Sequence, residues 1–138
     1  MRLGVEITRN PHRLAALCHL WRRQEAEIWL TLEGYSMLPG IPPGSRVRVS
    51  FGYYEPSIGE VVAALQGSRL LIHRLVRIDR GSTGTPLYVC QGDANPRPDP
   101  PVPAEQLVGI VREHRRPSGI TRLHRGIRRL LRHSLVSR

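Results

Sequence analysis

The sequence predicts a mainly β domain with an amphipathic helix at each end. Its 13 glycines and 12 prolines are distributed among short bursts of valine, isoleucine and leucine through the middle of the chain. This pattern is typical of short strands joined by tight turns. With 138 residues and 40% apolar composition, the chain can form one hydrophobic core. Two separate cores are not expected at this length.

The first predicted helix spans residues 11–26. Its apolar side chains recur at positions i, i+3, i+4 and i+7, and they are Leu14, Leu17, Cys18 and Trp21. This spacing places them on one face of a helix, with charged residues around them. Asn10 can cap the helix, and Pro11 suits the first turn because its missing N–H costs little there.

Six strands are expected after this helix, from apolar alternation and from short apolar runs bounded by turn residues. They span residues 28–32, 46–50, 59–65, 70–78, 87–91 and 106–111. In the fourth strand, His73 shares a face with Leu71 and Leu75. Five prolines lie between residues 95 and 103. This segment can hold neither a helix nor an inner strand, because proline lacks an N–H donor.

The second predicted helix spans residues 118–136, with an isoleucine and leucine stripe and arginines over the rest of its surface. The formal net charge is +10, and nine arginines lie between residues 112 and 138. Coulomb attraction would suit an anionic membrane or, less well supported, a nucleic acid as partner. A docking helix for a partner protein and a solvated helix packed on the domain are the alternatives.

Cys18 and Cys90 lie far apart in unlike surroundings, and they match neither a disulfide framework nor a metal-ligand spacing. We expect two buried thiols, and neither a metal nor a cofactor. The chain contains no apolar run approaching the roughly 18 residues of a spanning helix, and we expect no secretory signal. These features predict a cytoplasmic protein, at most attached to the surface of a membrane.

Ser36 is the candidate nucleophile. It follows the end of the first predicted strand, where Gly34 and Pro39 supply a bend. Such a bend would expose the hydroxyl and aim backbone N–H groups at a reacting oxygen. A serine hydroxyl is a weak nucleophile until a base takes its proton, and the chain contains no lysine. A histidine is therefore the expected base.

His73 is the only histidine in the β-rich middle of the chain, and burial among apolar neighbours would keep its ring neutral near pH 7. Asp93 or Asp99 could accept the second ring N–H. Each residue alone has a commoner structural interpretation, Ser36 as a turn residue, His73 as a core residue and Asp93 as part of an Asx turn. The catalytic interpretation therefore depends on their joint order and spacing.

These segments resemble, in order, the sequence boxes of the type I signal peptidase family, specifically its archaeal and endoplasmic-reticulum branch with serine, histidine and aspartate. The matching segments are residues 34–39 for the nucleophile box, 43–49 and 59–62 for two strand motifs, 71–76 for the histidine box, 91–99 for the Gly-Asp-Asn box and 107–111 for the closing strand. The resemblance covers about residues 28–112. It implies a coiled β-sheet or barrel catalytic domain, a fold shared with self-cleaving repressors.

By the same resemblance, Ser36 is the acyl-forming nucleophile, and its N–H contributes to the oxyanion hole. His73 is the general base, and Asp93 or Asp99 supports it. The chain departs from the family pattern at Gly34, where many members carry a hydroxyl residue. We also expect it to lack the N-terminal membrane anchor that the family usually has. The strand motifs also differ from the family pattern, because Ser45 and Glu60 stand where aspartates are usual.

The expected organisation has three parts: an N-terminal amphipathic helical segment at residues 1–27, a catalytic β domain at 28–112 and an Arg-rich C-terminal helical tail at 113–138. The predicted function is that of a serine endopeptidase that cleaves a peptide or leader through an acyl-enzyme. The alternative is a non-catalytic basic module that binds nucleic acid or an anionic membrane through the tail. Only 5% of the residues are aromatic, which weighs against stacking on single-stranded nucleic acid.

Overall fold

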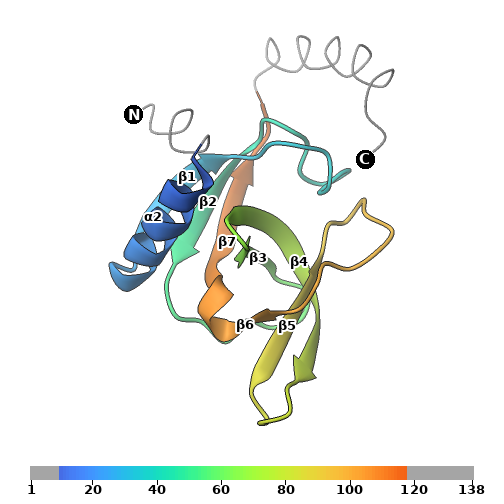
Figure 1. Ribbon diagram of the computed structural model, residues 1–138. Helices are drawn as coiled ribbons and strands as arrows, with labels where there is room; N and C mark the ends of the chain where they lie inside the picture. Colours follow the sequence, from blue (N-terminus) through green and yellow to red (C-terminus); the bar gives the residue numbers. More distant parts are fainter. Residues whose placement is uncertain (1–9, 118–138) are drawn as a thin grey trace.

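The computed structural model describes residues 10–117, which form one antiparallel sheet with a helix packed against it (Figure 1). The strands are β1 (Glu27–Thr31), β2 (Arg46–Phe51), β3 (Val61–Gln66), β4 (Arg69–Arg80), β5 (Pro86–Gln91), β6 (Val102–Pro103) and β7 (Leu107–Arg115). Their order across the sheet is β1-β2-β7-β3-β4-β5-β6. Helix α2 (Pro11–Arg23) precedes β1, and a 3-10 turn (Ala104–Gln106) precedes β7. The predicted mainly β fold is confirmed.

Helix α2 begins where the sequence predicted and ends earlier. The side chain of Asn10 accepts a hydrogen bond from the N–H of Arg13. The helix ends at Arg23 instead of residue 26, because Glu25 has a left-handed φ of 50° and such a residue turns the chain out of the helix. The second predicted helix, residues 118–136, lies outside the described residues.

All six predicted strands are present, with differences near the C-terminus. Residue 106 belongs to the 3-10 turn, and β7 continues to Arg115, past the expected end at 111 and across the domain boundary expected after 112. The extra residues are polar, so apolar alternation could not reveal them. Their pairing with β2 holds them in the sheet, where Glu113 contacts Arg48 at 3.3 Å. The proline-rich segment contributes β6, which lies at the sheet edge, where a missing donor is tolerated.

The two faces of the sheet carry separate apolar clusters. Strand β3 contributes to both, with Ala63 in one cluster and Val62 in the other, because successive side chains of a strand point to opposite faces. Helix α2 covers the first cluster, into which it inserts Cys18. The Trp21 ring of α2 packs against Phe51 of β2 at a centroid distance of 5.1 Å. Burial on both faces explains why β3 is a continuous apolar run.

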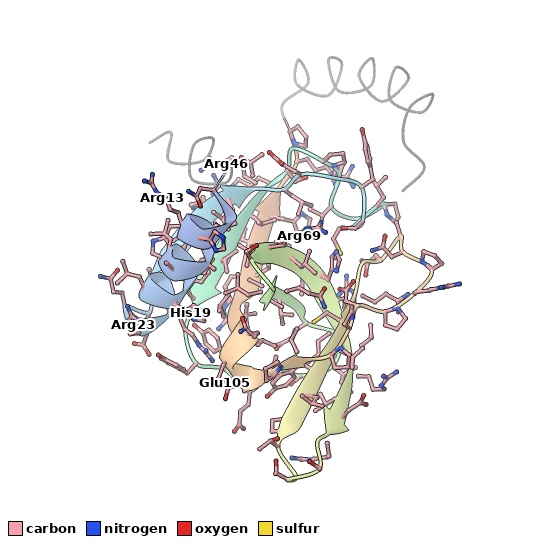
Figure 2. The ribbon with its side chains drawn as sticks, in the orientation of Figure 1. Arg13, His19, Arg23, Arg46, Arg69 and Glu105 are labelled. Carbon is pink, nitrogen blue, oxygen red and sulfur yellow. The ribbon has the colours of Figure 1, made fainter. Side chains whose placement is uncertain are left out.

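Arg22 fastens the end of α2 to two loops of the sheet. Its guanidinium donates to the carbonyl oxygens of Gly52 at 3.2 Å, Ala104 at 2.9 Å and Glu105 at 3.0 Å. Its neighbour Arg23 is exposed and is directed away from the sheet (Figure 2). Within residues 10–117, no helix combines the length and the apolar composition that a membrane span requires.

Irregular strand pairing lets the sheet coil. Register shifts interrupt the pairing of β2 with β7, of β3 with β7 and of β4 with β5. Such bulges bend a strand and increase its twist. As a result, the connection after β1 meets the loop after β5, where the Ala94 N–H donates to the Ser36 carbonyl at 2.8 Å. The coiling of the sheet thus brings the turn that carries Ser36 to the loop that carries Asp93 and Asp99.

Candidate active site

Ser36 lies between β1 and β2 in a turn that is anchored by a buried methionine. Met37 is fully buried in the cluster beneath α2, whereas Ser36 is half-buried. The Met37 carbonyl accepts a hydrogen bond from the N–H of the buried Ile41 at 2.9 Å. Gly34 has a φ of 79°, a left-handed conformation that glycine adopts without steric cost. These contacts produce the predicted bend and present the serine hydroxyl beside the sheet.

His73 lies on β4 opposite Val62 of β3, and only 6% of its surface is exposed. Its Nε2 atom lies 3.0 Å from the Ser36 hydroxyl oxygen, and its Nδ1 atom lies 2.5 Å from a carboxylate oxygen of Asp99. A carboxylate accepts hydrogen bonds, so the neutral ring carries its proton on Nδ1. The lone pair of Nε2 then faces the serine hydroxyl.

Asp99 reaches His73 from the proline-rich loop between β5 and β6. Its N–H donates to the Cys90 carbonyl at 2.7 Å, and prolines at 98 and 100 flank it and restrict the backbone on both sides. Its side chain is 17% exposed. The prolines that exclude an inner strand here therefore also stiffen the backbone that positions the carboxylate.

Asp93 does not contact His73. Its two carboxylate oxygens accept hydrogen bonds from Nε and Nη2 of Arg74, both at 2.9 Å. Arg74 also donates from Nη1 to the carbonyl of Gly59 at 2.7 Å, and the Asp93 carboxylate raises the pKa of the guanidinium. From the sequence, either aspartate could be the partner of His73. The structure places Asp99 at the histidine and Asp93 against Arg74.

Gly92 and Ala94 belong to the site and carry no reactive group. A Cβ atom at Gly92 would lie 2.7 Å from the Ser36 carbonyl oxygen and 2.8 Å from the Ser36 Cβ, so only glycine allows this close approach. The Ala94 N–H holds the same carbonyl. The sequence predicts this segment only as a turn that supplies an aspartate. The glycine beside the aspartate was the available signal for a close contact.

The Ser36 N–H has no hydrogen-bond partner within residues 10–117. A backbone N–H adjacent to a reacting hydroxyl can donate to an oxygen that becomes negatively charged during acyl transfer. Neither Ser45 nor Glu60, the two replaced aspartates, contacts this set of residues. Ser45 is buried and its hydroxyl has no partner in the described part of the chain, while Glu60 accepts the Ser57 N–H at 3.0 Å.

Both cysteines are free and buried. Burial raises the pKa of Cys18 to about 12, and burial together with the nearby Asp99 charge raises the pKa of Cys90 to about 11. Such thiols stay protonated at neutral pH and are poor nucleophiles. Among the described residues, no three histidine, cysteine, aspartate or glutamate side chains cluster as metal ligands do.

The sequence model of one protein family, Peptidase S24-like, matches residues 3–84. The match covers more than half of the chain and includes Ser36 and His73, while Asp93 and Asp99 lie beyond it. No curated protein gives a significant match to the chain.

Proposed function

This chain belongs to the Peptidase S24-like family, and from that membership we propose that it is an active serine endopeptidase. The observation that carries the proposal is the continuous chain of contacts from the Ser36 hydroxyl through both ring nitrogens of His73 to Asp99. Nucleophile, base and orienting carboxylate in this arrangement define the serine-hydrolase triad. The reaction is hydrolysis of a peptide bond through an acyl-enzyme.

In the acylation step, Ser36 Oγ attacks the carbonyl carbon of the scissile peptide bond while His73 Nε2 takes the hydroxyl proton. The Asp99 carboxylate, which accepts the Nδ1–H, stabilises the imidazolium that forms. The Ser36 N–H donates to the oxyanion of the tetrahedral intermediate. When the intermediate collapses, the C–N bond breaks, and His73 returns the proton to the leaving amine.

In the deacylation step, a water molecule attacks the ester carbonyl and gives a proton to His73 Nε2. Collapse of the second intermediate breaks the bond to Ser36 Oγ, which regains its proton from the imidazolium. His73 acts as a base and then as an acid in each half-reaction, always through Nε2, while Nδ1 keeps its proton. The fixed Asp99 contact at Nδ1 favours the tautomer that each cycle requires.

The proposed substrate is a peptide or the leader of a larger precursor, and the proposed triad corresponds to the Ser/His/Asp branch of signal peptidases. The absence of lysine from the chain supports this branch over enzymes that use a lysine base. The half-buried turn of Ser36 and the buried His73 form the centre at which an extended peptide would be cleaved.

The experiment that tests the proposal is labelling of the full chain with a fluorophosphonate probe, which transfers its phosphonyl group to an activated serine as fluoride leaves. We expect one adduct, located at Ser36 by mass spectrometry, and loss of labelling in Ser36→Ala. His73→Ala should lower the labelling rate by about 10⁴-fold or more, because triad members act as a unit. Ser82→Ala and His12→Ala replace exposed residues and should label like the wild type. Unchanged labelling of Ser36→Ala would refute the proposal.

A basic binding module is the second candidate function, and one surface feature favours it. Arg46 and Arg115 face each other in register on β2 and β7, and both guanidinium groups lie over the Trp29 ring, at 5.1 and 4.6 Å from its centroid. Like charges placed directly opposite each other repel, and a bound anion would relieve that repulsion. Binding to nucleic acid that weakens steeply with salt, in a protein with no probe labelling, would favour this candidate over the peptidase.

A further inference from the structure

The loop between β5 and β6 binds the side chains of two consecutive residues of β4. Asp99, near one end of the loop, hydrogen-bonds His73, and Asp93, near the other end, forms a bidentate ion pair with Arg74. Successive side chains of a strand point to opposite faces. The two aspartates therefore hold the loop from both sides of β4, at the position that carries the base.

The same loop also holds the nucleophile. The Ala94 N–H donates to the Ser36 carbonyl at 2.8 Å, and the bare Cα of Gly92 packs against Ser36. Both contacts come from residues adjacent to Asp93. The backbone of Ser36 is thus connected to β4 through Ala94, Asp93 and Arg74. Arg74, where this connection meets β4, is the residue next to His73.

We propose that Arg74 and Asp93 form a positioning pair that sets the separation of the Ser36 hydroxyl from the His73 ring. This inference rests on the proposed peptidase function. Arg74 suits the role because its planar guanidinium binds a carboxylate through two parallel hydrogen bonds, which fixes orientation as well as distance. Its third contact, to the Gly59 carbonyl at 2.7 Å, ties the guanidinium to the loop before β3.

Loss of a residue that merely supports the fold would lower stability and labelling rate together. Loss of the Arg74–Asp93 pair should lower the labelling rate much more than the stability. The side chains of Arg74 and Asp93 are 39% and 27% exposed, and ion pairs this accessible contribute little to folding stability. Catalytic geometry is much more sensitive, since a displacement of about 1 Å can lower a rate by about 100-fold. We therefore expect a kinetic loss far larger than the change in melting temperature.

The test measures the second-order rate constant of fluorophosphonate labelling and the melting temperature of the full chain. Asp93→Asn keeps the size of the side chain and removes its charge. We expect it to label about 10- to 100-fold more slowly than the wild type, with a melting temperature within about 4 °C. The double variant with Arg74→Gln should label no more slowly than Arg74→Gln alone, because the two residues act through one contact.

A second bidentate pair in β4 provides a matched control. Arg77 donates to the Asp79 carboxylate at 2.7 and 3.1 Å, and neither residue contacts the loop or Ser36. Asp79→Asn should label at the wild-type rate. Three results would each overturn the positioning pair. The first is a wild-type labelling rate for Asp93→Asn, and the second is an equal loss of rate in Asp93→Asn and Asp79→Asn. The third is a double variant in which the rate losses of the two single variants multiply. Absence of labelling from the wild-type chain would instead overturn the proposed function.

Discussion

Replacing Gly92 by alanine tests whether close packing of two loops aligns the reacting groups. The new Cβ would lie 2.7 Å from the Ser36 carbonyl oxygen, 2.8 Å from the Ser36 Cβ and 2.7 Å from Nδ2 of Asn95. The Asn95 amide can rotate away, whereas Ser36 meets the methyl group with its backbone. The substitution therefore pushes the Ser36 turn away from the loop that carries Asp99.

The size of the displacement follows from these contacts. To restore an ordinary van der Waals separation of 3.4 Å, the Ser36 carbonyl and the new methyl group must move apart by about 0.7 Å. The Ser36 hydroxyl now lies 3.0 Å from His73 Nε2, so a shift of that size weakens or breaks this hydrogen bond. We expect labelling by a fluorophosphonate to slow by about 10- to 100-fold, and stability to fall by about 1 to 3 kcal/mol from overpacking.

The assay compares two quantities. Labelling rates are measured without denaturant at a temperature where the variant is folded, and stability is measured as the midpoint of denaturant unfolding. Gly40→Ala is the matched control, because a Cβ at Gly40, in the same β1–β2 connection as Ser36, meets nothing within 4 Å. It should change neither quantity appreciably. A Gly92→Ala protein that labels as fast as the wild type would refute the reasoning, because the turn would then tolerate the shift or the reaction would not depend on it.

Three further predictions concern the thiols, the helix anchor and the serine turn. At pH 8, iodoacetamide should alkylate Cys18 and Cys90 slowly in the folded protein and rapidly in urea, because burial raises both pKa values to about 11 or 12; rapid alkylation of the folded protein would contradict this. Arg22→Ala should lower the free energy of unfolding by about 2 kcal/mol, since three hydrogen bonds to backbone carbonyls are lost. Arg23→Ala should lower it little, and equal effects of the two substitutions in urea titrations would contradict the role of Arg22 in holding the helix. Met37→Ala should cost about 2 to 5 kcal/mol and slow probe labelling, and a change in neither would show that the buried side chain does not hold the turn.

Most helices and strands of the fold could be predicted from the sequence, because the residue patterns that indicate them lie within short segments of the chain. Alternating residues such as Ile28 and Leu30 predict one buried face of a strand, and Asn10 before Pro11 predicts a helix start. The pairing partners of each strand depend on distant segments, so neither the short β6 nor the polar end of β7 could be predicted. Arg115, for example, belongs to a strand only because β2 lies beside it.

The identity of the candidate nucleophile and base followed from the sequence alone, because a chain without lysine leaves histidine as the base and His73 lies in an apolar strand. The choice between Asp93 and Asp99 needed the tertiary structure. Consecutive residues of β4 face opposite sides, and the path of one loop across that strand decides which carboxylate meets the histidine and which meets Arg74. That path depends on how the sheet coils, and the coiling results from the packing of the whole chain.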